Sequence, residues 1–229
     1  MKKLLLFDID GTLIRSNGAG RLTLAYALET LYGTCGPLDS YNMSGKTDPR
    51  IITDLLTAVG IPAKEIEQKL PAIYELMVEH GQKIFWEKEM APCPGIEALL
   101  NQLTARDDLL LGLLTGNAQL TAPLKLTAAG LDPLLFKVGA YGSDALDRNE
   151  LPAIGMARAN QLTGGNFNGN NTIIIGDTPA DILCARAGRA TAVAVASGWH
   201  AASTLAEYHP DHLFDNLADT DQVLDVILG

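Results

Sequence analysis

The sequence predicts an α/β fold in which a doubly wound, Rossmann-like parallel sheet carries an inserted, all-helical cap. Three observations support this prediction. Short apolar runs recur along the chain, they are continuous rather than alternating, and segments of helical spacing separate them. Continuous apolar runs suit strands that are buried on both faces, as in a parallel sheet covered by helices. A long stretch without a convincing strand interrupts the pattern early in the chain and predicts the insertion.

Six apolar runs that end in turn residues are the predicted strands. They lie at 3–8, 109–117, 135–140, 172–178, 191–198 and 212–215. Segments with helical spacing follow several of them, at 118–129, 150–163, 179–188 and 218–228. Gly130 and Gly188 close two of these segments at the position of a helix C-cap. This alternation of strand and helix is typical of a doubly wound sheet.

Residues 16–89 break the alternation and predict a separate helical unit. Helical segments are expected near 18–32, 48–58 and 63–88. In the second of these, Asp48 takes the position of an N-cap and Pro49 that of the first helical residue. We therefore expect residues 16–89 to form the cap, and residues 1–15 and 90–229 to form the α/β core.

Composition and charge limit the classes of partner that the protein can bind. The chain has 229 residues, of which 47% are hydrophobic and 19% charged, and this composition is ordinary for a globular protein. Its 27 acidic residues exceed its 17 basic ones, and no block of Lys or Arg offsets the net charge of −10. This balance argues against binding to nucleic acid or to an anionic membrane surface. We expect a small molecule as the partner.

The cysteines and the N-terminus predict a cytoplasmic protein. Cys35, Cys93 and Cys184 lie far apart in the sequence and form no CxxC pair, so reduced thiols are expected. The apolar run that follows Met1-Lys2-Lys3 is only four residues long, which is too short for a signal peptide. The sequence does not choose between a monomer and a homodimer.

Polar residues follow three of the predicted strands at the points where the strands end. Because ligands bind at the carboxyl ends of parallel strands, these side chains are expected to converge. They are Asp8 and Asp10, then Thr115, Gly116 and Asn117, then Asp177, Thr178 and Asp181. Four neighbouring carboxylates repel one another and need a cation, and all-oxygen ligation favours Mg²⁺. A carboxylate beside such an ion can attack phosphorus and form an acyl phosphate.

At this point the chain resembles a known family. FDIDGT, LLTGN and IIGDTPAD, in this order and at strand ends, look like motifs one, two and four of the haloacid dehalogenase-like hydrolases. The resemblance covers essentially the whole chain, and its length, helical cap and GKTD segment are most similar to the phosphoglycolate phosphatase branch. It implies a magnesium-dependent phosphatase that hydrolyses a small phosphomonoester, 2-phosphoglycolate-like, through an aspartyl-phosphate intermediate.

The resemblance assigns roles to the residues of motif one. Asp8 would be the nucleophile and a magnesium ligand. Asp10 would protonate the leaving alcohol and then activate water, and its main-chain carbonyl would also bind the metal. Gly11 would lie in the phosphate-binding turn. Ile9 points the other way in an extended segment, which leaves both carboxylates on one side.

The resemblance assigns the remaining roles to motifs two and four. Thr115 and the backbone N–H of Gly116 would bind the phosphoryl oxygens, with Asn117 beside them. Asp177 would complete the magnesium ligands. Asp181 would either bind the metal or orient the residues that do.

The cation of the family's third motif is not obvious in this chain. That motif usually supplies a lysine, but residues 142–159 contain Arg148 and no lysine. Lys125, in the helix after motif two, is the other candidate for balancing the charge of the nucleophile and the phosphate. We favour Arg148 because of its position in the sequence, whereas helical periodicity places Lys125 about two turns past the pocket, on the surface.

The cap is expected to determine which substrate is chosen. Arg21, Lys46 and Arg50 lie near predicted turns that could face the site. Each could bind a carboxylate or hydroxyl group of the substrate. A solvated surface charge explains each of them equally well.

Three other functions fit part of this pattern. A phosphohexose mutase, such as β-phosphoglucomutase, would use the same Asp8 and Asp10 but would return the phosphoryl group to a sugar. A dehalogenase needs no metal, and that branch generally lacks the second aspartate, which is present here as Asp10. A phosphate-binding regulatory module would keep the fold without turnover, but the intact set of Asp8, Asp10 and Asp177 argues against it.

Overall fold

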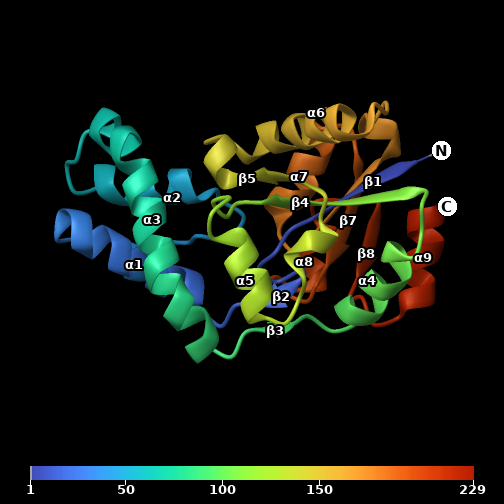
Figure 1. Cartoon of the computed structure of the whole chain (residues 1–229), viewed down its shortest axis with the longest axis horizontal. Helices are drawn as coiled ribbons and strands as arrows, with labels where there is room; N and C mark the ends of the chain where they lie inside the picture. Colours follow the sequence, from blue (N-terminus) through green and yellow to red (C-terminus); the bar gives the residue numbers. More distant parts are fainter. Residues whose placement is uncertain (1) are drawn as a thin grey trace.

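A six-stranded parallel sheet forms the centre of the protein, in the strand order β5-β4-β1-β6-β7-β8. A computed structural model describes residues 2–229 (Figure 1), so Met1, the first residue of the predicted core, lies outside the described residues. The strands are β1 (Lys3–Phe7), β4 (Leu109–Thr115), β5 (Val138–Tyr141), β6 (Thr172–Gly176), β7 (Thr191–Val195) and β8 (His212–Phe214). The predicted α/β class with a parallel sheet is thereby confirmed.

Helices cover both faces of this sheet, as the continuous apolar strands predict. Leu4 and Leu6 of the central strand face helices α6 (Leu151–Thr163) and α7 (Pro179–Ala187). Leu5 and Phe7 point the opposite way, into a cluster with α4 (Ile96–Thr104), α5 (Ala122–Ala128) and α9 (Thr220–Leu228). The short helix α8 (Ala202–Ala206) leads into β8. Strand β1 pairs with β4 on one side and with β6 on the other, so its end lies at the middle of the sheet.

Three helices between the first and second strands of the sheet pack around a hydrophobic cluster of their own. They are α1 (Ala19–Tyr32), α2 (Asp48–Thr57) and α3 (Ala63–Glu87), and they lie beside the sheet in Figure 1. A short antiparallel pair, β2 (Ile14–Arg15) and β3 (Ala91–Pro92), joins the segments before and after them. The all-helical insertion is present as expected, and the boundaries of a cap at residues 16–89 remain a prediction.

Two helix starts differ from the sequence-based expectation, and both differences involve Asp48. Asp48 is the first residue of α2 rather than its N-cap, and its carboxylate accepts a hydrogen bond from the backbone N–H of Ala118, at 2.7 Å. Residues 118–121 form a turn, so the helix expected from residue 118 begins only at Ala122. A turn that is hydrogen-bonded to Asp48 therefore lies where helical periodicity alone predicts the first residues of the helix.

Two smaller differences concern a strand and a helix end. The run expected as a strand at 135–140 begins with a 3-10 turn at Pro133–Leu135, and β5 follows from Val138. Gly188 ends α7 in a right-handed conformation, and the next residue, Arg189, adopts the left-handed one. Gly130 has a φ of +82°, as expected for a glycine that follows a helix.

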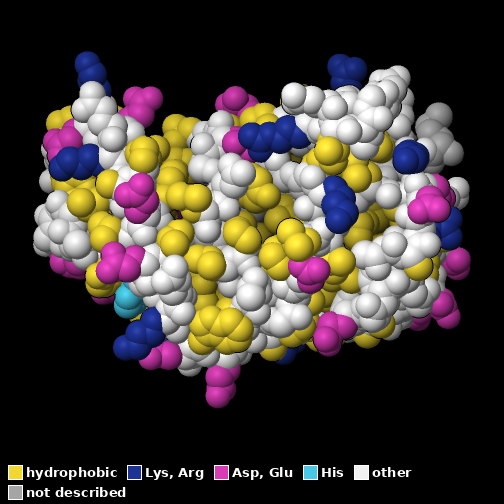
Figure 2. Space-filling model, viewed as in Figure 1, with side chains coloured by type: hydrophobic (Ala, Val, Ile, Leu, Met, Phe, Trp, Pro, Cys, Tyr) yellow, Lys and Arg dark blue, Asp and Glu magenta, His cyan; other side chains and the backbone are white. Residues whose placement is uncertain are grey.

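Charged side chains of both signs are mixed on the face of the protein in Figure 2. Lys and Arg side chains are interspersed there with Asp and Glu side chains rather than gathered into one patch. Cys35, Cys93 and Cys184 are all free thiols. Within residues 2–229, none of the helices combines the length and the hydropathy that crossing a bilayer requires.

Truncating Leu6 tests the packing of the central strand. Leu6 is fully buried, with 0% of its surface exposed, against α6 and α7. We expect Leu6→Ala to lower the free energy of unfolding by about 2–5 kcal/mol, because the cavity that it leaves cannot collapse completely. Denaturant unfolding measures the change. Leu134→Ala, at a position that is 74% exposed, is the control and should change stability little; equal losses in the two variants would contradict the assigned core.

Candidate active site

The functional residues of three strands meet at the carboxyl edge of the sheet. Asp8 follows β1, Thr115 ends β4 and Asp177 follows β6. A cavity of about 550 Å³ opens at this edge, with α1, α2 and α3 contributing part of its wall. The structure therefore brings these side chains together, as expected from the sequence.

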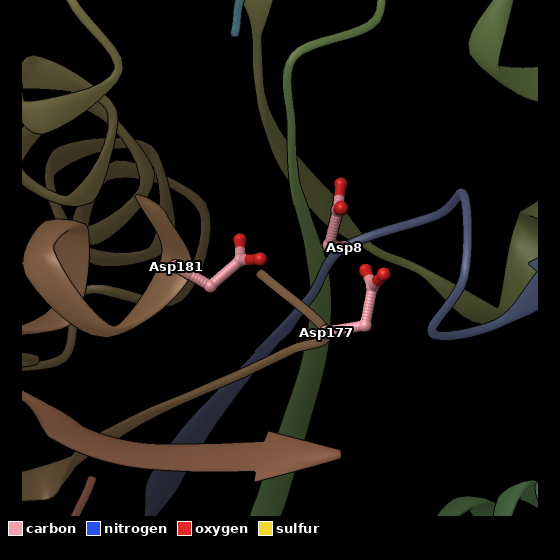
Figure 3. A group of neighbouring side chains, drawn as sticks. All are labelled: Asp8, Asp177 and Asp181. Carbon is pink, nitrogen blue, oxygen red and sulfur yellow. The ribbon is translucent and has the colours of Figure 1, made fainter. Parts of the chain in front are cut away.

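Three buried carboxylates form the centre of the site. Asp8, Asp177 and Asp181 each offer an oxygen, and these oxygens lie within 4.8 Å of one another. Figure 3 shows Asp8 and Asp177 side by side, with the Asp181 carboxylate reaching toward them from α7. All three side chains are buried. The carboxylate of the fourth expected ligand, Asp10, does not belong to this group.

Burial and mutual repulsion raise the free energy of the ionised forms of these three carboxyl groups. Burial raises the pKa of Asp8 to about 6; Arg148 opposes the shift, whereas Asp181 and Asp10 add to it. Burial also raises the pKa of Asp177, and the charges of Asp181 and Asp8 raise it further. A bound cation would offset this cost, since an opposite charge favours the ionised form of a carboxyl group.

Close backbone packing holds Asp177 in place. Gly11 has a φ of +88°, and a Cβ atom there would collide with the Asp177 carboxylate, so only glycine fits this turn. The hydroxyl of Thr12 donates to Asp177 Oδ1 at 3.2 Å, and the hydroxyl of Ser197 donates to the carbonyl of Gly11 at 2.7 Å. In this structure Gly11 thus makes room for a carboxylate, and its expected contact with phosphate remains a prediction.

Arg148 lies between the nucleophile candidate and Asp181. Its guanidinium Nη2 donates to Asp181 Oδ1 and lies 3.3 Å from Asp8 Oδ1. The other oxygen of Asp181 accepts from the backbone N–H and the hydroxyl of Thr178, at 3.0 and 2.7 Å, in a capping box of α7. Arg148 is therefore positioned beside Asp8, as its place in the sequence suggested, and both oxygens of Asp181 are engaged.

Lys125 lies inside the site, so the expected surface position is wrong. Lys125 lies in the last turn of the short helix α5, and its buried side chain lines the cavity. Its ammonium donates to both oxygens of Asp10, at 2.9 and 2.7 Å, and to the side-chain oxygen of Asn117. Burial raises the pKa of Asp10, but the charge of Lys125 and the hydrogen bonds from Lys125 and Asn117 together lower it below its usual value.

The loop after β4 contacts both the site and the segment before α2. Asn117 donates from its side-chain nitrogen to Asp10 Oδ2 at 2.7 Å and to the hydroxyl of Thr115 at 2.8 Å. A Cβ atom on Gly116 would collide with the carbonyl oxygen of Lys46, which explains the glycine at this position. All three residues line the cavity, as expected from the sequence.

The cap residues suggested as substrate contacts have different positions. Arg21 lines the cavity, but its guanidinium donates to the carbonyls of Leu38 and Tyr41. Lys46 also lines it and donates to the Tyr41 hydroxyl at 2.7 Å. Arg50 does not line this cavity; it pairs with Asp54, four residues later on the same helix. The structure therefore brings two of the three candidates to the site.

Three cavity residues have no role in the sequence-based reasoning. Asp48 was read only as a helix cap, although it follows the polar GKT segment that marks this turn. Trp199 lines the cavity and is 91% exposed. Next to it, His200 Nε2 lies 2.9 Å from the hydroxyl of Ser44, and this contact joins the loop after β7 to the segment before α2. Trp199 and His200 directly follow the predicted strand at 191–198, and this position is the signal in the sequence that points to them.

Removing Arg148 should damage stability as well as the site. We expect Arg148→Ala to lower the free energy of unfolding by about 3–5 kcal/mol, because it leaves buried carboxylates without their cation. Urea unfolding at neutral pH measures this loss. Arg106→Ala is the control: it removes an arginine that pairs with Asp108 at the surface and should leave stability unchanged. Identical behaviour of the two variants would show that Arg148 does not stabilise the carboxylate group.

Comparison with known proteins agrees with this geometry. The family model of the haloacid dehalogenase-like hydrolases matches residues 5–195. A phosphoglycolate phosphatase from Colwellia psychrerythraea (strain 34H) is 26% identical over 216 residues, which cover 93% of each chain.

Solved structures share the fold over nearly the whole chain. A hydrolase from Pseudomonas syringae superimposes with a TM-score of 0.70 at 21% identity, covering 99% of both chains. CbbY from Rhodobacter sphaeroides, solved in complex with phosphate, gives a TM-score of 0.71 at 17% identity over 96% of both chains. The matching family model spans the strands that carry Asp8, Thr115 and Asp177. The chain therefore belongs to the haloacid dehalogenase-like hydrolases, and it is a phosphatase of this family.

Proposed function

We propose that this phosphatase depends on Mg²⁺ and hydrolyses a small phosphomonoester, about the size of 2-phosphoglycolate, through an aspartyl-phosphate on Asp8. The observation that carries the proposal is the buried group of Asp8, Asp177 and Asp181 beside Arg148. The relative from Colwellia psychrerythraea, named as a phosphoglycolate phosphatase, supports the size of the substrate. The three free cysteines support a cytoplasmic location for the protein and its substrate.

The residues of the site fit a magnesium ion. Within residues 2–229, Asp8 Oδ1 is buried without a hydrogen-bond partner, with Arg148 Nη2 at 3.3 Å, and an oxygen of Asp8 lies within 4.8 Å of an oxygen of Asp177. Hard carboxylate and carbonyl oxygens are the ligands that Mg²⁺ prefers. Asp8, Asp177 and the main-chain carbonyl of Asp10 would hold the ion. Both oxygens of Asp181 already accept hydrogen bonds. Asp181 is therefore better placed to orient Arg148 than to bind the metal. When bound, Mg²⁺ would offset the charge of the nucleophile and the phosphate.

The protein's own groups would carry the two steps of the reaction. Asp8 attacks phosphorus while the bond from phosphorus to the leaving oxygen breaks, and Asp10, which has to enter this step protonated, gives that oxygen its proton. Asp10 then takes a proton from water, whose oxygen attacks the aspartyl-phosphate, so that inorganic phosphate leaves and Asp8 is restored. Thr115 and the backbone N–H of Gly116 would bind the phosphoryl oxygens. Arg148 would stabilise the charge that develops there.

Replacing the nucleophile tests the reaction. We expect Asp8→Asn to lower kcat on p-nitrophenyl phosphate by about 10⁴-fold or more, because an amide cannot form the intermediate. Asp39→Asn, at an exposed position among the cap helices, is the matched control and should retain full activity. Inorganic phosphate and alcohol should appear in equal amounts when a small phosphomonoester is hydrolysed. Undiminished turnover by Asp8→Asn would end the nucleophile assignment, and an isomeric sugar phosphate as the product would favour a mutase.

Magnesium should stabilise the folded protein in a pH-dependent way. Burial raises the pKa of Asp8 in the folded state to about 6. Without metal, the contribution of Asp8 to the free energy of unfolding is therefore most favourable below about pH 4, and it is lost as the pH rises through 6. At pH 8, Mg²⁺ at 100 times its Kd should add about 2.7 kcal/mol of stability, with less at pH 5 because protons compete. Thermal unfolding with Mg²⁺ or with chelator measures this difference.

The matched variant for this experiment is Asp177→Asn. It removes one proposed ligand while the amide can still accept from Thr12, so we expect most of the stabilisation by Mg²⁺ to disappear. The same stabilisation in the variant as in the unaltered protein would show that Asp177 does not hold the ion.

A further inference from the structure

Asp48 is a buried carboxylate that the proposed mechanism does not use. It is 8% exposed and lines the cavity from the start of α2. Its Oδ2 accepts from the N–H of Ala118 at 2.7 Å, and its own N–H donates to the carbonyl of Gly116 at 2.7 Å. The side chain is thus held in one orientation by the loop that follows β4.

The second oxygen of Asp48 is open to the cavity. Within residues 2–229, no donor bonds to Oδ1, and this atom is also absent from the buried unpartnered side-chain atoms, so solvent can reach it. Burial raises the pKa of Asp48 to about 6, against the opposing effects of Lys125 and the Ala118 N–H. At neutral pH the cavity therefore contains a fixed, ionised acceptor.

This acceptor lies near the residue proposed to protonate the leaving group. Asp48 bonds to Gly116 and Ala118, and Asn117 between them donates to Asp10 Oδ2 at 2.7 Å. Lys125 donates to Asp10, which in the proposed mechanism protonates the leaving oxygen. A group attached to that oxygen would extend toward Asp48.

The basic residues of the cavity wall differ in how far protein acceptors engage their N–H groups. Lys125 donates to both oxygens of Asp10 and to Asn117, which uses all three of its N–H bonds. Arg21 donates to two main-chain carbonyls, and Lys46 donates to a tyrosine hydroxyl. A carboxylate on the substrate placed against Asp48 would meet a like charge, which repels it, whereas a hydroxyl group there can donate to Oδ1.

We propose that Asp48 accepts a hydrogen bond from a hydroxyl group on the leaving group, so that the enzyme prefers hydroxylated phosphomonoesters to carboxylate-bearing ones of the same size. This inference rests on the proposed function and narrows it, because 2-phosphoglycolate then indicates only the size of the substrate. Asp48 is thereby a specificity-determining residue.

Three two-carbon phosphomonoesters that differ only in their terminal group provide the test. They are 2-hydroxyethyl phosphate, 2-phosphoglycolate and phosphoethanolamine, with p-nitrophenyl phosphate as a reference substrate. We expect kcat/KM to be about 10- to 100-fold higher for the hydroxyl compound than for the carboxylate, the range of a hydrogen bond to a charged group. A preference of the unaltered protein for 2-phosphoglycolate would overturn the proposal, and a preference for phosphoethanolamine would reassign the donor to an ammonium group.

Asp48→Asn is the sharpest variant, because its side-chain oxygen can still accept from Ala118 while its NH₂ group presents a donor to the cavity. We expect the preference for the hydroxyl compound to collapse or reverse toward 2-phosphoglycolate, mainly through KM, while turnover of p-nitrophenyl phosphate persists. Asp39→Asn should keep the original ratio. An unchanged ratio in Asp48→Asn, with hydrolysis still dependent on Asp8, would refute this inference alone. No hydrolysis of any phosphomonoester by the unaltered protein would refute the proposed function as well.

Discussion

Concentrated negative charge at the carboxyl edge of the sheet is the constraint on which the rest of the site depends. Asp8, Asp177 and Asp181 are buried within a few ångströms of one another, and burial raises the pKa of both Asp8 and Asp177. The surrounding structure compensates with a guanidinium from Arg148, with hydrogen bonds from the turn that begins α7, and with a glycine at position 11 that leaves room for a carboxylate. A divalent cation would supply the charge that these groups do not.

Two cations lie beside the two aspartates of motif one. Arg148 lies beside Asp8, whereas Lys125 pairs with Asp10. The two aspartates differ in pKa: burial keeps the pKa of Asp8 raised despite Arg148, whereas the charge of Lys125 and the hydrogen bonds from Lys125 and Asn117 bring the pKa of Asp10 below its usual value. This order is the reverse of the one that the proposed roles need, because a nucleophile must be ionised and a general acid protonated. A cation bound beside Asp8 would lower the pKa of Asp8.

The segment before α2 connects substrate choice to the phosphate-binding loop. The carbonyl of Lys46 packs against Gly116, and Asp48 bonds to this loop through both its backbone and its side chain. A rearrangement of residues 45–48 would therefore disturb the backbone N–H groups next to Thr115. The same segment carries the open oxygen of Asp48, so recognition of the leaving group and positioning of the phosphate share one set of contacts.

The sequence by itself determined the parallel sheet, the helical insertion and the meeting of Asp8, Thr115 and Asp177. Apolar runs and the polar residues that end them are local patterns, and parallel topology brings strand ends together whatever lies between them. Only the tertiary structure decided the positions of Lys125 and Asp48. The hydrogen bond between Asp48 and Ala118 joins residues 70 positions apart, and Lys125, in the helix that follows this turn, donates to Asp10 at the cavity. No local periodicity contains such a contact, because it depends on how the inserted helices pack against the sheet.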